Sequence, residues 1–309
     1  MTRMKLLIDT DPGVDDALAI LMAHAHADVL GLSIAAGNVG IDHTVANALK
    51  LVETIGAETP VFAGCATPLV LPAEDAAFVH GADGFGDTGY TPSSRPAEDE
   101  AAALAILRLS HAHAGKLVLV AIAPLTNLAL ALKLDPALPQ RVAKLVIMGG
   151  AVTGRGNTQR VPAEFNIGFD PEAAHVVFSS FPQFTLVDWE ATMRHGIAFE
   201  RMQAWLDADN PRARFYASIS RKTHAWSRER GRPNVLVADA LAMAVALQPD
   251  IVTRAEDRHV AIELTGTHTR GATVVDWESR LGQAANARIV LDVDQARFEA
   301  LVAAALGCA

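Results

Sequence analysis

Four aspartates crowd one short segment near the start of this 309-residue chain. The segment IDTDPGVDDA carries them at positions 9, 11, 15 and 16, directly after the apolar residues Leu6–Ile8. Carboxylates this close repel one another unless a cation, a shared proton or solvent relieves the repulsion. The segment therefore predicts a charged turn that could be a helix cap, a phosphoryl-transfer nucleophile or a metal site.

Each of the three interpretations uses the aspartates differently. As a helix cap, Asp11 would begin the helix after Pro12-Gly13, with Asp15 and Asp16 near its positive end, but Asp9 would have no role. In a phosphatase of the haloacid-dehalogenase type Asp9 would be the nucleophile, although Pro12-Gly13 departs from that pattern. As a metal site, Asp11, Asp15 and Asp16 could converge on a hard cation such as Ca²⁺, which takes roughly six to eight oxygen ligands.

Short apolar strands alternate with helical patterns along the chain. We predict strands at 4–8, 31–35, 116–122, 144–148, 184–187 and 287–290. We predict helices at 14–26, 42–55 with Asp42 as N-cap, after 122 through 133, 171–179, 199–207, 212–227, 236–247 and 295–306. This alternation is typical of an α/β fold with a Rossmann-like core, in which helices flank a mostly parallel central sheet. No linker divides the chain, so we expect a single domain over residues 1–309.

Polar and glycine-rich turns follow four of the predicted strands, at residues 9–11, 37–38, 124–127 and 149–150. Ligands bind beyond the carboxyl ends of such strands, so this edge of the sheet is the predicted active site. The glycine-rich loop at 81–96 is expected to form a lid or a wall beside it.

Composition excludes several classes of protein. The net charge of −9 and the lack of a long basic cluster argue against a nucleic-acid partner; the RERGR run at 228–232 is interpreted as a solvated helix end. Two cysteines without a CxxC pair give no disulfide framework or zinc cluster. No apolar segment is long enough to span a membrane, and no signal peptide is evident. We expect a cytoplasmic protein.

Several segments together resemble the inosine-uridine-preferring nucleoside hydrolases. They follow the family order and cover most of the chain: DTDPGVDDA (9–17), AAGNV (35–39), HGADG (80–84), APLTNLA (123–129), VIMGGA (146–151), EFNIGFDPEAA (164–174), ADALAMA (238–244) and RGATVVDW (270–277). The resemblance implies one α/β domain that hydrolyses the N-glycosidic bond of ribonucleosides to free base and ribose, as in nucleoside salvage.

The resemblance also implies a metal site for one Ca²⁺. Asp11, Asp16 and Asp239 would bind the ion together with the backbone carbonyl of Thr126. Asp11 would in addition take a proton from the calcium-bound water, since the cation lowers the pKa of that water. Asp9 is left without a chemical task and is expected to be a supporting hydrogen-bond acceptor.

Substrate contacts follow from the same resemblance. The residues implied for the ribose and the rest of the substrate site are Asp15, Asn38, Met148, Asn157, Glu164 and Asn166, with His80 in the base pocket. For Glu164 and Asn166 the spacing adds a prediction: in an extended segment both would face one pocket while Phe165 faces away.

One position departs from the family pattern. Many members carry histidine immediately before the last metal aspartate, where it can protonate the leaving base, and this chain has Ala238 there. Help for the leaving base would then come from His80 or from His224, Trp226 or Arg230 on the preceding helix. A protein that binds ribosides without turnover is the alternative. Family members also imply a homodimer or homotetramer.

Overall fold

A nine-stranded sheet forms the centre of the computed structural model, which describes residues 3–308, and its strand order is β10-β9-β11-β6-β5-β4-β1-β2-β3. The strands are β1 (Lys5–Thr10), β2 (Asp28–Ile34), β3 (Val61–Ala63), β4 (Leu117–Ala121), β5 (Val142–Met148), β6 (Phe184–Val187), β9 (Val252–Ile262), β10 (Thr273–Asp276) and β11 (Ala287–Val293). Neighbours from β11 to β3 pair in parallel, whereas β9 runs antiparallel to both β11 and β10. The predicted α/β domain with a mostly parallel sheet is confirmed.

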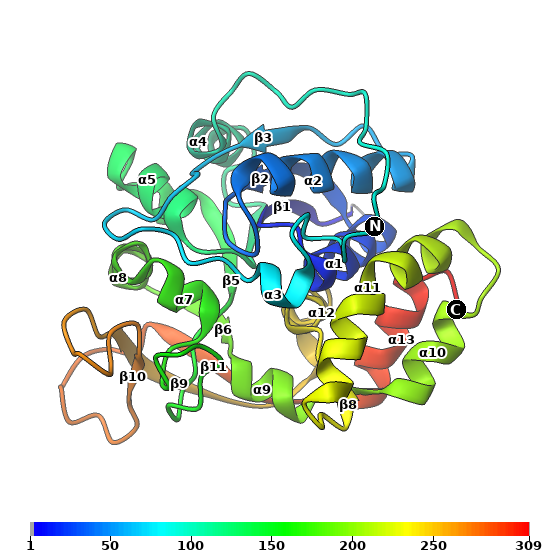
Figure 1. Ribbon diagram of the computed structural model, residues 1–309. Coiled ribbons are helices and arrows are strands. Elements are labelled where there is room, and N and C mark those ends of the chain that lie inside the picture. Colours follow the sequence, from blue (N-terminus) through cyan, green and yellow to red (C-terminus); the bar gives the residue numbers. More distant parts are fainter. Residues whose placement is uncertain (1–2, 309) are drawn as a thin grey trace.

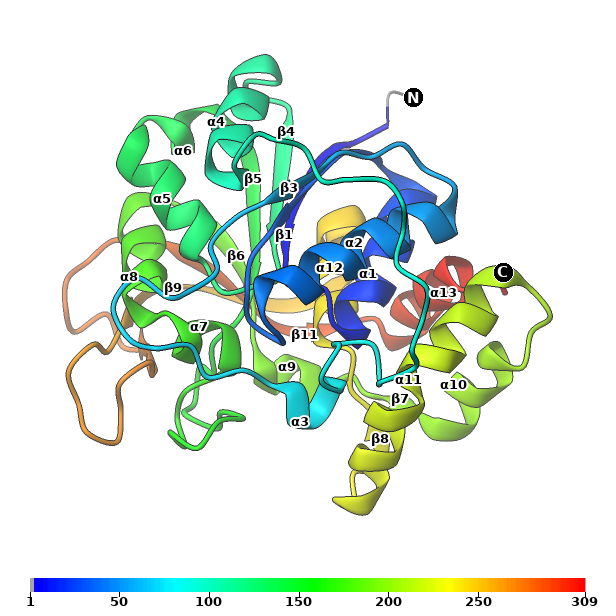
Figure 2. The same ribbon diagram turned by 45° about the horizontal axis from the view of Figure 1, so that its top comes forward.

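Helices cover both faces of the sheet (Figures 1 and 2). They are α1 (Val14–His26), α2 (Ile41–Ile55), α3 (Ala77–His80), α4 (Ala102–Ala112), α5 (Thr126–Leu134), α6 (Leu138–Arg141), α7 (Phe165–Phe169), α8 (Pro171–Ser180), α9 (Trp189–Arg194), α10 (Phe199–Leu206), α11 (Pro211–Glu229), α12 (Ala238–Leu247) and α13 (Gln295–Ala305), with a 3₁₀ turn η1 (Pro249–Ile251). A separate antiparallel pair joins β7 (Ile197–Ala198) to β8 (Asn234–Val235). No helix in the described part of the chain combines the length and the apolar character needed to traverse a bilayer.

The apolar strands divide their side chains between two cores. In β1, Leu6 and Ile8 pack with α1, α12 and α13, while Leu7 packs on the opposite face with α4, α5 and α8. All five residues of β4 are buried in the same alternating way. Successive strand residues point to opposite faces, so a strand covered on both sides must be apolar throughout. The continuous apolar runs of the sequence have this origin.

Several element boundaries differ from the predictions. Helix α1 and strand β6 have the predicted bounds, but β2 begins earlier, at Asp28, and α2 begins at Ile41 with Gly40 as its N-cap. Asp42 is therefore in the first turn and does not cap the helix. The edge strands β3 and β10 and the strand β9 beside β10 are absent from the predicted elements, and in β9 charged residues interrupt the apolar pattern.

The loop at 81–96 packs against the body of the protein. Phe85 is fully buried and contacts the rings of Tyr90 and Phe215, while Asp87 forms an ion pair with Lys222 of α11. None of these sixteen positions, all of which the structure describes, lines the cavity at the sheet edge. The prediction of a lid or wall is wrong for this loop, and the wall is instead formed by Ala76–His80 just before it.

Candidate active site

A cavity of about 170 Å³ lies at the carboxyl ends of the central strands. Parallel pairing brings these ends to one edge, so segments that follow β1, β2, β4, β5 and β6 meet there. The cavity is lined by eleven of the residues predicted for the site: Asp11, Asp15, Asn38, His80, Met148, Asn157, Glu164, Asn166, His224, Trp226 and Asp239. Asp16, Thr126 and Arg230 are not among the lining residues.

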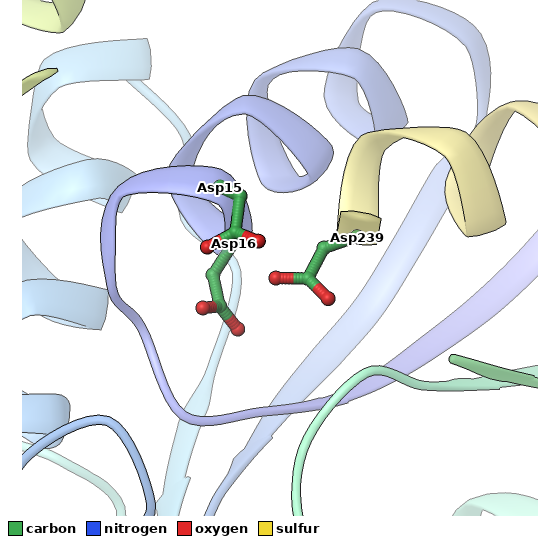
Figure 3. A group of neighbouring side chains, drawn as sticks. All are labelled: Asp15, Asp16 and Asp239. Atoms are coloured by element: carbon green, nitrogen blue, oxygen red, sulfur yellow. The ribbon is translucent and has the colours of Figure 1, made fainter. Parts of the chain in front are cut away.

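Three carboxylates form a compact acidic cluster beside the cavity. Oxygens of Asp15, Asp16 and Asp239 lie within 4.8 Å of one another. Figure 3 shows Asp15 and Asp16 on the first turn of α1 and Asp239 approaching from the start of α12. Asp11, which the resemblance assigns to the metal, is outside this group, whereas Asp15, which the resemblance assigns to the ribose, is inside.

Asp16 is held in place from several directions. Its Oδ1 accepts hydrogen bonds from the Thr10 hydroxyl at 2.6 Å and the Asp11 amide at 3.2 Å. Its Oδ2 accepts from the Gly13 amide at 3.0 Å and from Nδ2 of Asn38 at 2.9 Å. Burial and the neighbouring Asp15 carboxylate nevertheless raise the pKa of Asp16 to about 6.

Asp11 has one oxygen without a partner. Its Oδ2 accepts the backbone N–H of Asn38 at 2.7 Å, and Gly37 permits this approach because a Cβ there would lie 2.1 Å from the same oxygen. Its Oδ1 is buried and has no hydrogen-bond partner in the described chain. Burial and the Asp16 carboxylate raise the pKa of Asp11 well above its usual range. The side chain is thus placed to accept a proton or a cation.

The acidic cluster fits a hard divalent cation. Burial together with Asp15, Asp16 and Asp11 raises the pKa of Asp239 well above its usual range. No arginine or lysine within residues 3–308 forms a salt bridge with any of these four aspartates. Uncompensated carboxylates with a free oxygen at Asp11 are the donor set that Ca²⁺ and Mg²⁺ bind.

Thr126 is the first residue of α5 and follows β4 at the same sheet edge. Its hydroxyl donates a hydrogen bond of 2.7 Å to Oδ2 of Asp170.

Asp9 accepts two hydrogen bonds at the end of β1. Nδ2 of Asn127 donates to it at 3.0 Å, and Ser33 donates to the same Asp9 oxygen at 2.6 Å. The expected role of Asp9 as a supporting acceptor is confirmed.

The phosphatase interpretation of Asp9 is wrong. A nucleophile must face its substrate, but the Asp9 side chain is fully buried and does not line the cavity. Its hydrogen bonds instead join the end of β1 to β2 and α5.

Glu164 and Asn166 both line the cavity, but for a different reason than predicted. The segment is not extended: Glu164 is the N-cap of the short helix α7, and its carboxylate accepts from the amides of Gly150, Asn166 and Ile167. Asn166 donates to the backbone oxygen of Met148 at 3.2 Å. Phe165 also lines the cavity, so the prediction that it faces away is wrong. Burial raises the pKa of Glu164 to about 7.

His80 approaches the cluster from α3. The backbone N–H of Val14 donates to its Nδ1 at 3.2 Å, so in the neutral ring the hydrogen resides on Nε2. Burial lowers the pKa of His80 to about 4, which keeps the ring neutral near pH 7. His80 can therefore donate one hydrogen bond from Nε2.

Residues of α11 line the cavity together with Ala238. His224 lines it with a buried Nε2 that has no partner in the described chain, and burial and Arg228 lower its pKa to about 4. Trp226 also lines the cavity. Arg230 contacts the Trp226 ring at 4.0 Å but is exposed and does not reach the cavity.

Tyr216, Trp189 and Arg232 are among the lining residues that the sequence-based set lacks. The half-buried guanidinium of Arg232 lies 4.9 Å from the centre of the Trp226 ring and 5.5 Å from that of Trp189. Trp189 could have been found, because it follows the carboxyl end of β6 like the other site residues. The interpretation of the run at 228–232 as a solvated helix end is wrong for Arg232, which is half-buried and lines the cavity.

Comparison with known proteins agrees with this geometry. The sequence model of the inosine-uridine preferring nucleoside hydrolase family matches residues 6–300. The non-specific ribonucleoside hydrolase RihC of Klebsiella pneumoniae is 38% identical over 96% of each chain. The structure of an inosine-guanosine nucleoside hydrolase has a TM-score of 0.92, at 32% identity over 99% of each chain. A purine-preferring ribonucleoside hydrolase from Gardnerella vaginalis has a TM-score of 0.90, at 30% identity over 99% of this chain and 100% of that one. The chain therefore belongs to the inosine-uridine preferring nucleoside hydrolase family.

Proposed function

We propose that the protein hydrolyses the N-glycosidic bond of ribonucleosides with one Ca²⁺, releasing free base and ribose. The observation that carries this proposal is one cavity with uncompensated carboxylates at one side, amide and carboxylate side chains around it, and an arginine near two tryptophans. Ribose offers hydroxyl groups to the first two sets, and a planar base can stack with the third.

The proposed ligands of the ion are Asp11, Asp16, Asp239 and the backbone carbonyl of Thr126. The Asp15 carboxylate lies close to those of Asp16 and Asp239. It is assigned to the ribose, which it would bind next to the ion. A bound Ca²⁺ would supply positive charge that holds these carboxylates ionised and acidifies water at the site. Thr10, Gly13 and Asn38 keep Asp16 oriented for this task.

Asp11 is the proposed general base. Its unpartnered Oδ1 accepts a proton from water as the water oxygen bonds to C1′ and the bond from C1′ to the base nitrogen breaks. The electron pair of that bond leaves with the base. Asn38 restrains the other oxygen, so Asp11 meets the water in one orientation.

The sugar is held by Asp15, Asn38, Asn157, Glu164 and Asn166 in this proposal. Charge builds on the ribose ring in an oxocarbenium-like transition state, and hydroxyl hydrogen bonds to carboxylates strengthen as it does. The bonds that Gly150, Asn166 and Ile167 donate to Glu164 favour its ionised form against burial.

Leaving-group help is assigned to Arg232, with His80 as a neutral donor. His224 is neutral near pH 7, because burial and Arg228 lower its pKa, so like His80 it carries only the single N–H of a neutral ring; Arg230 is outside the cavity. Arg232 lines the cavity, keeps its charge and is stacked against Trp226 and Trp189. Its charged hydrogen bond would stabilise the departing base in place of the proton transfer that Ala238 cannot provide.

A reducing-sugar assay tests the proposal. Purine, pyrimidine and nicotinamide ribosides are incubated with the calcium-loaded protein, with and without chelator. Ribose release that chelator abolishes and Ca²⁺ restores is expected. Calcium binding without ribose release from any riboside would instead identify a binding protein. Homo-oligomerisation and a cytoplasmic location stay predictions.

A further inference from the structure

The loop that leads to Asn157 has an unusually complete set of hydrogen bonds. The residues from Gly150 to Asn157 belong to no helix or strand, yet every backbone N–H among them donates. Gly150, Val152, Thr153 and Arg155 donate to carboxylates, and Ala151 donates to the Thr273 hydroxyl. Such a loop is held in one conformation although it has no regular structure.

Two of those carboxylates flank a cavity residue at the start of α9. Asp188 Oδ2 accepts from the Val152 amide at 2.9 Å while its Oδ1 caps α9. Glu190 Oε1 accepts from the Thr153 amide at 2.8 Å and the Arg155 amide at 3.3 Å. Trp189, between them, lines the cavity beside Arg232. One short segment thus contacts both the base side of the cavity and the loop that carries Asn157.

Glu190 serves the loop and not its own helix. Both of its oxygens accept from loop residues, since Oε2 takes the Thr153 hydroxyl at 2.7 Å. It is only 7% exposed, and no lysine, arginine or histidine in residues 3–308 forms a salt bridge with it. Buried carboxylates are normally paired with cations, so the loop donors are what make this charge tolerable here.

We propose that Glu190 is a positioning residue for sugar recognition, which places Asn157 in the cavity by holding Thr153 and Arg155. The inference rests on the proposed function, in which Asn157 binds the ribose. Without Glu190, two loop amides and one hydroxyl lose their acceptor and the chain before Asn157 can move. Displacements of about 1 Å can lower rates about a hundredfold, so a loss of tenfold or more, roughly, is expected in kcat/KM.

The test compares Glu190→Ala, Asn157→Ala and the double variant in the calcium-loaded protein. Binding of D-ribose and of free base is measured by calorimetry, kcat/KM by ribose release, and Tm by calorimetric scanning. We expect Glu190→Ala to weaken ribose binding about tenfold while binding of the base is unchanged. The double variant should be no worse than Asn157→Ala, because both changes remove the same contact.

Two further variants separate positioning from stability. Glu190→Gln keeps an acceptor for the loop amides, so it should restore ribose binding; Glu200→Ala removes an exposed carboxylate from α10 and should change nothing. If Glu190→Ala does not fold, Thr153→Val removes the hydroxyl donor alone and should weaken ribose binding in the same direction.

Multiplicative losses in the double variant, or a lower Tm with unchanged ribose binding, would overturn the inference and leave the proposed function intact. A wild type that neither binds nor releases ribose would overturn both.

Discussion

Replacing Arg232 with methionine removes one positive charge from the base side of the cavity and keeps a side chain of similar length. The guanidinium lies 4.9 Å and 5.5 Å from the ring centres of Trp226 and Trp189, and it is half-buried. The methionine thioether still packs on aromatic rings, so the tryptophans keep a neighbour. What is lost is the charged hydrogen bond to the departing base.

The expected magnitude follows from that bond. Hydrogen bonds to charged groups contribute about 1.5 to 3 kcal/mol. If Arg232 donates only as the base leaves, this energy appears in the transition state and lowers kcat/KM by about 10- to 150-fold. KM should change little, since the ground-state base carries no developing charge.

Two substrates and one matched variant make the assay specific. Inosine needs help for its leaving group, whereas 4-nitrophenyl riboside releases a stable phenolate without it. Arg232→Met should therefore be slow on inosine and close to wild type on the nitrophenyl compound. Arg230→Met is the control, because Arg230 contacts the same Trp226 at 4.0 Å but lies outside the cavity. Equal losses on both substrates, or an equal loss in Arg230→Met, would refute the leaving-group role.

Three further predictions concern the ion, the base and pH. At a hundred times its Kd, Ca²⁺ should add about 2.7 kcal/mol to the free energy of unfolding and raise Tm by several degrees; scanning calorimetry should show no such rise in Asp16→Asn, and an undiminished rise would contradict the assigned ligand. Asp11→Asn should lower kcat by about 10² to 10⁴ while calorimetry shows ribose still bound, and retained kcat would exclude Asp11 as the base. Burial lowers the pKa of His224 from 6.5 to about 4, so between these pH values the unfolded chain binds more protons than the folded one. The free energy of unfolding should therefore fall as the pH falls from 6.5 to 4. Urea unfolding should show a smaller fall in His224→Leu, and an identical fall would mean that other groups cause it.

The acidic segment shows how far local pattern reaches. The apolar residues Leu6–Ile8 predict a buried strand, and the aspartates that follow must stand at its carboxyl end, where parallel sheets bind ligands. That argument uses only neighbours along the chain, and the structure agrees with it. The same argument places Asn38 at this edge, whereas its 2.7 Å hydrogen bond to Asp11 depends on the pairing of β1 with β2.

The segment Glu164–Asn166 shows where local pattern fails. Alternation places Glu164 and Asn166 on one side only if the backbone is extended. The Glu164 carboxylate instead caps α7, and the Gly150 amide from a distant loop adds a third donor to it. The conformation of this segment therefore depends on hydrogen bonds that only the tertiary structure supplies.

The sequence by itself determined the α/β class, the position of the sheet edge and the types of residue gathered there, because strand and helix periods and strand-end polarity are local properties. Only the tertiary structure decided which members of that set face one another. Arg230 and Arg232 have the same side chain and lie two residues apart, yet the turn at Gly231, with φ of +66°, brings only Arg232 into the cavity. Likewise, only tertiary contacts bring Glu190 to the loop before Asn157, where the Thr153 amide and hydroxyl and the Arg155 amide donate to it.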